Sequence, residues 1–190
     1  MKVLGLDLST KTGWAVIADG NLIAYGLLHC EKRTPDPSLV PDYEYIRRAQ
    51  EMAERIHTLI CERTPDYIYI EATNAGRNRG PQKLLEMLHC LLLVRLQHNE
   101  PFAKLVRYID TSAWRTMIGL KLTTNDKKNN KLVRRKLKRG KITSKHLSVR
   151  WANQKFLLSL KIKDHDIADA LAVGFCGWCL ENLTINPPPF

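Results

Sequence analysis

Short apolar runs alternate with turn residues over the first 29 positions of the chain. The runs at 2–8, 13–18 and 22–29 predict three strands, because buried strands are typically short apolar runs bounded by turn residues. Asp19 and Gly20 separate the second run from the third, and this dipeptide is typical of a two-residue hairpin. We therefore expect an antiparallel three-stranded meander at the start of the chain.

A different spacing of apolar residues begins after position 41. Over 42–63 they recur every three or four positions, which predicts an amphipathic helix. The segment 82–97 is apolar on most sides and predicts a second helix that is largely buried. The β-rich runs at 67–70 and 104–109 predict two more strands, the first of which ends on Glu71.

The remaining sequence predicts helices rather than strands. We expect a short helix containing Trp114, a polar break at 123–130, a basic helix at 131–140, and helices at 151–160 and from about 164 to 180. Length and the absence of repeats predict a single domain over 1–185, followed by a Pro-rich tail at 186–190.

Positive charge is concentrated in one segment. Residues 121–150 hold 12 Lys and Arg and one acid, Asp126, whereas the other 160 residues hold 18 basic and 18 acidic side chains, so the whole excess of +11 lies here. Such a field attracts a polyanion, most often nucleic acid; the alternative is a solvated loop that is basic for solubility. The cations expected to contact phosphates are Arg77 and Arg79 in the loop after Glu71, and Lys127, Lys128, Lys131, Arg134, Arg135, Lys138, Arg139 and Lys141.

Composition excludes two classes of protein. No run of 18 apolar residues exists, so no membrane span is predicted. Five cysteines at scattered spacing do not resemble a disulfide framework, which favours a reducing, cytoplasmic compartment. Cys176 and Cys179 form a C-x-x-C, but it falls late in a predicted helix, and we expect buried residues there rather than a redox pair.

Four carboxylates occupy positions suited to metal binding. Asp7 interrupts the first apolar run, and burial of an Asp is costly unless it is paired or holds a metal; alternatively, it ends the strand and caps a turn. Glu71 ends a strand, where α/β sheets commonly place chemistry. Asp166 and Asp169 share one face near the start of a helix, although capping and the helix dipole account for one such Asp. Carboxylates converging at one sheet edge suit Mg²⁺.

The chain resembles the RuvC-type Holliday junction resolvases of the ribonuclease H-like superfamily. The matching stretches are GLDLSTKTGWAVI at 5–17, IYIEATN at 68–74 and DIADALAVG at 166–174, of which the last is the most specific. Where the superfamily has a glycine turn after its Asp, this chain has Leu8 and Ser9, a form closer to phage-encoded members. The resemblance implies a ribonuclease H-like α/β fold, with a mixed five-stranded sheet whose first three strands are antiparallel and helices on both faces.

The resemblance also implies a function, that of a homodimeric endonuclease that nicks four-way DNA junctions symmetrically in recombination and repair. Its catalytic residues and metal ligands, carried over by position, would be Asp7, Glu71, Asp166 and Asp169. Two Mg²⁺ ions per site, replaceable by Mn²⁺, would stabilise the attacking and leaving oxygens during phosphodiester hydrolysis. A phage-encoded member would act in the host cytoplasm.

Other segments take expected roles from the same comparison. The loop at 74–82 would approach the junction centre, although it lacks the aromatic wedge of some members. The apolar helix at 82–97 would form the dimer face, and 121–150 would be a DNA-contacting insertion. His165 is expected to start a helix, with assistance to proton transfer by His165 and Lys163 as the alternative.

Three other functions fit part of the sequence. A related nuclease of the same fold would cut RNA or other branched DNA. A non-catalytic nucleic-acid-binding module would use the basic segment and would need no set of four carboxylates. An actin-like kinase or ATPase shares the combination of Asp with Ser, Thr and Gly near the first strand, but that fold needs two lobes, and 190 residues have room for one.

Overall fold

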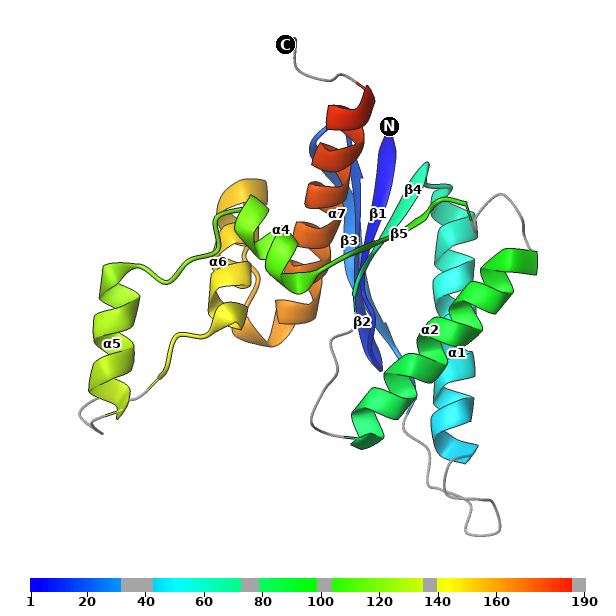
Figure 1. The fold of residues 1–190 in the computed structure, drawn as a ribbon, viewed down its shortest axis with the longest axis horizontal. Helices are drawn as coiled ribbons and strands as arrows, with labels where there is room; N and C mark the ends of the chain where they lie inside the picture. The colour runs from blue at the N-terminus through cyan, green and yellow to red at the C-terminus, as the bar shows by residue number, and fades with distance from the viewer. Residues whose placement is uncertain (32–42, 73–78, 99–103, 135–139, 186–190) are drawn as a thin grey trace.

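A mixed five-stranded sheet of order β3-β2-β1-β4-β5 forms the centre of the molecule (Figure 1). Strands β1 (Lys2–Asp7), β2 (Lys11–Ala18) and β3 (Asn21–His29) form the antiparallel meander predicted from the sequence. Strands β4 (Tyr67–Glu71) and β5 (Val106–Ile109) continue the sheet in parallel with β1. The predicted sheet, including its antiparallel first half, is confirmed.

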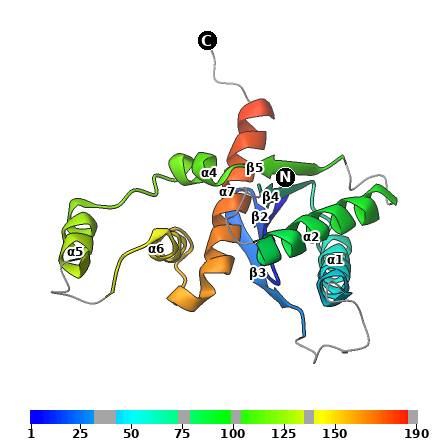
Figure 2. The same ribbon diagram turned by 60° about the horizontal axis from the view of Figure 1, so that its bottom comes forward.

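Helices cover both faces of this sheet in the computed structural model, which describes residues 1–31, 43–72, 79–98, 104–134 and 140–185. Helices α1 and α2 pack together on one face, and α7 lies across β1, β2 and β4 on the other (Figures 1 and 2). Helices α4 and α6 pack against α7, while α5 stands away from the sheet beyond α6. The helical elements are α1 (Tyr43–Arg63), α2 (Arg79–His98), α4 (Thr111–Met117), α5 (Thr124–Arg134), α6 (Ser144–Phe156), the short 3₁₀ helix η1 (Ile162–Asp164) and α7 (His165–Ile185).

Side chains alternate between the two faces along each central strand. Leu4 and Leu6 of β1 join the apolar core beneath α1 and α2, whereas Val3 joins the core beneath α7. In β4, Ile68 likewise faces α1 and α2, and Tyr69 faces α7. Because side chains point to opposite faces with a period of two, odd-numbered residues of both strands lie on the α7 side.

Glycines allow α7 to lie very close to the sheet. A Cβ atom on Gly5 would stand 2.3 Å from the backbone nitrogen of Gly174, and one on Gly13 would stand 1.9 Å from the carbonyl oxygen of Asp166. Side chains at Gly5 and Gly13 would therefore force the layers apart. These contacts fix the start of α7 beside the ends of β1 and β2.

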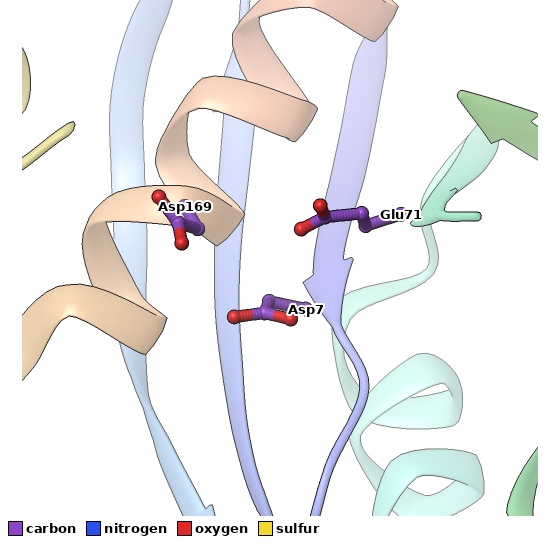
Figure 3. A group of neighbouring side chains, drawn as sticks. All are labelled: Asp7, Glu71 and Asp169. Carbon is purple, nitrogen blue, oxygen red and sulfur yellow. The ribbon is translucent and has the colours of Figure 1, made fainter. Parts of the chain in front are cut away.

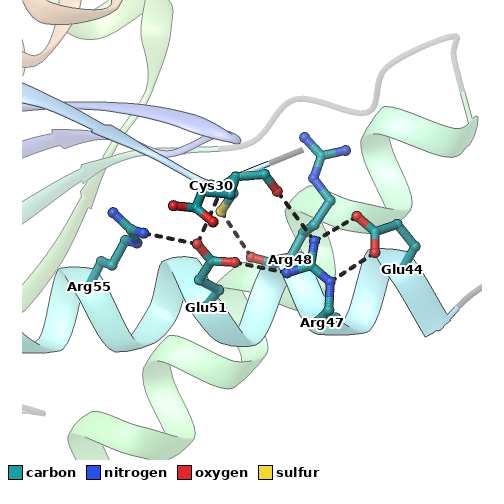
Figure 4. Close-up of polar contacts among 7 residues, drawn as sticks. Cys30, Glu44, Arg47, Arg48, Glu51 and Arg55 are labelled. Atoms are coloured by element: carbon teal, nitrogen blue, oxygen red, sulfur yellow. Dashed lines mark hydrogen bonds and ion pairs between the residues drawn. The ribbon is translucent and has the colours of Figure 1, made fainter. Parts of the chain in front are cut away.

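A polar network joins the end of β3 to the first turns of α1 (Figure 4). Arg47 bonds to Glu44 and Glu51, and Glu51 also accepts from the backbone N–H of Glu31. The Cys30 thiol donates to the carbonyl oxygen of Arg48. The network fixes α1 against the sheet and lies apart from the carboxylates singled out above.

Two predicted helix boundaries are wrong. The segment 123–130, predicted as a polar break, contains most of α5, because Thr123 and Asp126 form reciprocal hydrogen bonds that start a helix there. Helix α6 begins at Ser144 rather than at 151 and ends where Leu157 adopts a left-handed conformation (φ 54°). Part of the predicted basic helix, 135–139, and the predicted tail, 186–190, lie outside the described residues.

The helix α2 is buried along one face rather than on most sides. Leu84, Leu88, Leu92 and Leu96 lie in the core, while Val94 is 48% exposed. All five cysteines lie within the described residues and are free thiols; Cys176 is buried in α7 as predicted, whereas Cys179 is only half-buried. Across the described ranges, every helix is too short or too polar to span a lipid bilayer.

Candidate active site and metal centre

Three of the predicted carboxylates converge at one end of the sheet (Figure 3). Asp7 ends β1, Glu71 ends β4, and Asp169 lies in the second turn of α7. One oxygen from each side chain lies within 4.8 Å of the others, and this is the group of possible metal ligands found among the described residues. The structure thus brings these three predicted residues together.

Strand register explains why Asp7 and Glu71 meet. Leu6 pairs with Ile70 in the parallel β1–β4 ladder, so the next residue of each strand lies at the same level. Both are odd-numbered and point to the α7 side. The close approach of α7 to Gly13 then brings the start of that helix over the strand ends, where its positive dipole favours carboxylates.

Asp166, the fourth predicted ligand, reaches the cleft without joining the three-residue group. It lines an open cleft of about 300 Å³ together with Asp7, Glu71 and Asp169. Its Oδ1 lies 2.6 Å from Nδ1 of His165, although that contact does not have hydrogen-bond geometry. The structure therefore places Asp166 in the cleft, and its role as a ligand stays a prediction.

Burial and neighbouring negative charge make Asp7 and Asp169 hard to ionise. The pKa of Asp7 is raised well above its ordinary value, first by burial and then by Glu71, Asp169 and Asp166, with Lys145 opposing them. Burial also raises the pKa of Asp169 to about 6; Glu71 and Asp166 add to this effect, and the Ser148 hydroxyl and the Arg115 charge oppose it. A bound cation would remove this repulsion.

One buried oxygen of the cluster has no hydrogen-bond partner among the described residues. Oδ1 of Asp169 is enclosed and accepts no hydrogen bond from the described residues. Buried polar atoms are rarely left without a partner, and four carboxylates offer the oxygen ligands that Mg²⁺ and Mn²⁺ prefer. The donor set therefore fits a divalent cation held by Asp7, Glu71 and Asp169, with Asp166 close by.

The structure adds residues that the sequence analysis did not single out. Lys145, from the first turn of α6, lines the cleft, and its Nζ lies 2.6 Å from Nε2 of His165. The Thr111 hydroxyl donates to Glu71 from the start of α4. Neither is signalled in the sequence, because Lys145 is one cation among twelve in its segment and Thr111 is an ordinary helix-start residue.

Those predicted phosphate-binding cations that the structure describes with their side chains lie outside this cleft. Lys127, Lys128, Lys131 and Arg134 are exposed on α5, and Lys141 is exposed between α5 and α6. The structure does not describe Arg77, Arg135, Lys138, Arg139 or the side chain of Arg79. Their proposed contacts with nucleic acid therefore stay predictions.

The fold resembles those of known Holliday junction resolvases. The sequence matches no protein-family model and no curated protein. The structure superposes on Thermus thermophilus RuvC in complex with a Holliday junction substrate, with a TM-score of 0.63, 13% identity and 96% of each chain covered. A second Thermus thermophilus RuvC structure gives a TM-score of 0.56, 17% identity and 97% coverage of each chain.

A eukaryotic structure gives the same result. The yeast mitochondrial Holliday junction resolvase Ydc2 matches with a TM-score of 0.52 and 15% identity over 93% of this chain and 76% of that one. The chain therefore has the fold of RuvC, and the ribonuclease H-like α/β architecture predicted from its sequence is confirmed.

Proposed function

We propose that this protein is a metal-dependent endonuclease that nicks four-way DNA junctions. The observation that carries the proposal is the cluster of half-buried Asp7 and Glu71 with buried Asp169, one oxygen of which has no partner among the described residues, at the end of a RuvC-like sheet. The open cleft around the cluster leaves a scissile phosphate room to enter. The solved neighbours act on, or are bound to, Holliday junctions, which supports four-way junctions as the substrate.

Mg²⁺, with Mn²⁺ as a substitute, is the proposed cofactor, and Asp7, Glu71, Asp169 and Asp166 are the proposed catalytic residues that hold two ions. When bound, these ions supply charge for the attacking and leaving oxygens of phosphodiester hydrolysis. The Thr111 hydroxyl holds Glu71 in place through its hydrogen bond. Lys145 places a positive charge at the cleft beside His165, where it can attract a phosphate oxygen.

The proposal includes two partners, branched DNA and a second copy of the chain. Four-way junctions have two equivalent strands to cut, so symmetric nicking requires two sites. The exposed side of α2, which carries Leu93 and Val94, is the proposed dimer face. The excess of basic residues in 121–150 supports nucleic acid as the substrate class.

A related nuclease acting on RNA or on other branched DNA is the second candidate, because carboxylates and metal ions do not distinguish DNA from RNA. A purely non-catalytic module is disfavoured by the carboxylate cluster. Its burial and repulsion raise the pKa values of Asp7 and Asp169, and a protein that only binds nucleic acid gains nothing from that arrangement.

The test is a cleavage assay on end-labelled substrates with Mg²⁺ and with EDTA. The substrates are a four-way DNA junction, a linear duplex of the same sequence and an RNA–DNA hybrid. We expect paired, symmetric nicks on the junction alone, lost in EDTA. Preferential cutting of the hybrid would move the substrate to RNA, and no metal-dependent cutting of any substrate would overturn the nuclease proposal.

A further inference from the structure

Helix α5 has two chemically different sides. Asp126, Asn129 and Asn130 lie on the side that faces the following segment and α6, where they make hydrogen bonds to Gly140, Ile142 and Arg150. The cations Lys127, Lys131 and Arg134, spaced i, i+4 and i+7, are exposed. At this spacing they form one stripe along the helix, centred about 110° around the helix axis from the side that makes the polar contacts.

The sole acid of the basic segment anchors the helix instead of neutralising the stripe. Asp126 is buried, and both of its carboxylate oxygens accept from the Arg150 guanidinium of α6, at 3.2 and 3.3 Å. It also accepts from the backbone N–H of Thr123. These bonds lower the pKa of Asp126 to about 2. At neutral pH its negative charge is therefore paired with Arg150, and the positive charge of the stripe is not neutralised by it.

A second pair of hydrogen bonds holds the middle of α5. The side chain of Asn130 both donates to the carbonyl oxygen of Ile142 and accepts from its N–H, at 2.9 and 2.8 Å. This two-way pairing resembles that between neighbouring β-strands, and it joins the middle of α5 to the segment that leads into α6. The helix therefore has a defined position although it stands apart from the sheet (Figures 1 and 2).

Chain connectivity places the stripe close to the acidic cleft. Ile142 is three residues before Lys145, which lines the cleft, so their Cα atoms are at most roughly 11 Å apart. Helix α5 has 11 residues and is about 16 Å long. The stripe therefore lies within about one duplex turn, roughly 34 Å, of the carboxylates.

We infer that the Lys127, Lys131 and Arg134 stripe on α5 is a fixed clamp for the phosphate backbone of duplex DNA, within one helical turn of the cleft. The relation to a cutting site rests on the proposed function, whereas binding of duplex backbone by α5 does not. Three cations on one exposed helix face match consecutive phosphates without reading bases. The Asp126–Arg150 pair is the contact that holds α5, and with it the three cations, in position.

The test compares two triple variants of the full chain for binding to labelled DNA. The first carries Lys127→Gln, Lys131→Gln and Arg134→Gln. The control carries Arg55→Gln, Arg95→Gln and Lys104→Gln, which removes the same charge from α1, α2 and the turn before β5. Binding to a four-way junction and to a linear duplex is measured in EDTA over a range of KCl concentrations, so that the result does not depend on cleavage.

The α5 variant is expected to bind both DNAs on the order of tenfold or more weakly at about 0.1 M salt, with a salt slope lower by about 2.7, because each phosphate contact contributes about 0.9. The control is expected to retain most of its slope. Equal losses in the two variants would show that net charge alone matters and would overturn the inference.

A single substitution tests the anchoring. Asp126→Asn makes the protein more positive, so charge alone predicts tighter binding, whereas loss of the Arg150 contact is expected to weaken duplex binding several-fold. Tighter binding would overturn the fixed clamp.

In hydroxyl-radical footprints, the protection lost in the α5 variant should lie within one turn of the junction centre; loss farther away would overturn the proposed placement. If no substrate is cut but these binding results hold, the proposed function fails and the clamp stands.

Discussion

Asp7 shows how a single side chain can be unfavourable for the metal-free fold and yet suited to binding a cation. It lies at the end of β1 between Glu71 and Asp169, and burial and these neighbours raise its pKa. In the absence of a cation, its negative charge is poorly compensated. This arrangement is expected at a site that binds metal, because a cation reverses the sign of the local interaction.

Asp7→Asn is therefore expected to abolish cleavage while leaving junction binding intact or tighter. The amide keeps the shape of the carboxylate but loses its charge, so it is a weak metal ligand and repels phosphate less. We expect a fall in the single-turnover cleavage rate of about 10³-fold or more, with an unchanged or lower Kd in EDTA. Cutting at the wild-type rate would exclude Asp7 as a ligand.

Metal affinity is expected to fall in acid because protons compete for the same oxygens. Asp169, with its pKa raised to about 6, must lose a proton before it binds a cation. Above that pH the Asp169 carboxylate is ionised and its own proton no longer competes; below it, the apparent Kd for Mg²⁺ should rise by up to about tenfold per pH unit for each proton displaced. Calorimetric titration at about pH 7.5 and pH 5 checks this, and equal affinities at both would contradict it.

At the scale of elements, the site depends on how closely α7 approaches β1. The backbone of Gly174 fills the place that a side chain on Gly5 would take. A substitution there acts on the metal centre without touching any carboxylate, because it changes the spacing between Asp7 on the strand and Asp169 on the helix. The glycine pair is therefore both a packing feature and a determinant of site geometry.

Gly5→Ala is expected to lower the free energy of unfolding by about 3 kcal/mol, at the upper end of overpacking costs, and to reduce cleavage and Mg²⁺ affinity together. Gly174→Ala is the matched control, because its Cβ would stand 3.2 Å from the nearest backbone atom rather than 2.3 Å, so a smaller loss is expected. Chemical denaturation measures both. A Gly5→Ala protein as stable as wild type would show that the layers can separate freely.

Strand ends were predictable from this sequence, and helix placement was less so. Glu71 follows a short apolar run, so local pattern alone placed it at the end of a strand. The same pattern placed Asp7 inside a strand predicted to reach residue 8, with the strand end as the alternative, and β1 in fact ends at Asp7. The pattern of apolar residues does not indicate the start of α5, because this helix of polar residues has no apolar stripe. The signal present in the sequence is the Thr123–Asp126 pair, which forms the reciprocal hydrogen bonds of a helix cap. The position of Lys145 in the cleft depends on α6 packing against α7, a contact between elements that no local pattern encodes.

On the scale of the whole molecule, the site lies where two packing layers end. The core beneath α1 and α2 and the core beneath α7 enclose the sheet on both faces, and the cluster lies at the edge of the α7 layer. Rigid packing thus holds Asp7 and Asp169 together against their repulsion. Exposed cations on α5, among them Lys127, Lys131 and Arg134, lie outside both layers, so the proposed nucleic-acid contacts and the proposed metal ligands belong to separate parts of the molecule.

Because the packed core holds repelling carboxylates together, a change at the cluster is expected to alter the stability of the whole protein in a metal-dependent way. The folded protein binds protons at Asp7 and Asp169 more tightly than the unfolded chain, so these groups reduce stability as pH rises from about 4 through their raised pKa values. In EDTA at neutral pH, Asp7→Asn should therefore raise Tm by several degrees, because about 1 kcal/mol corresponds to about 2–4 °C in a chain of this size.

Mg²⁺ should raise the Tm of the wild type, since a ligand that binds only the folded state stabilises it, and should raise that of the variant much less. Calorimetry with and without Mg²⁺ separates the two effects. A variant that is less stable than wild type in EDTA, with no response of either protein to Mg²⁺, would mean that the carboxylates serve the fold and not a metal.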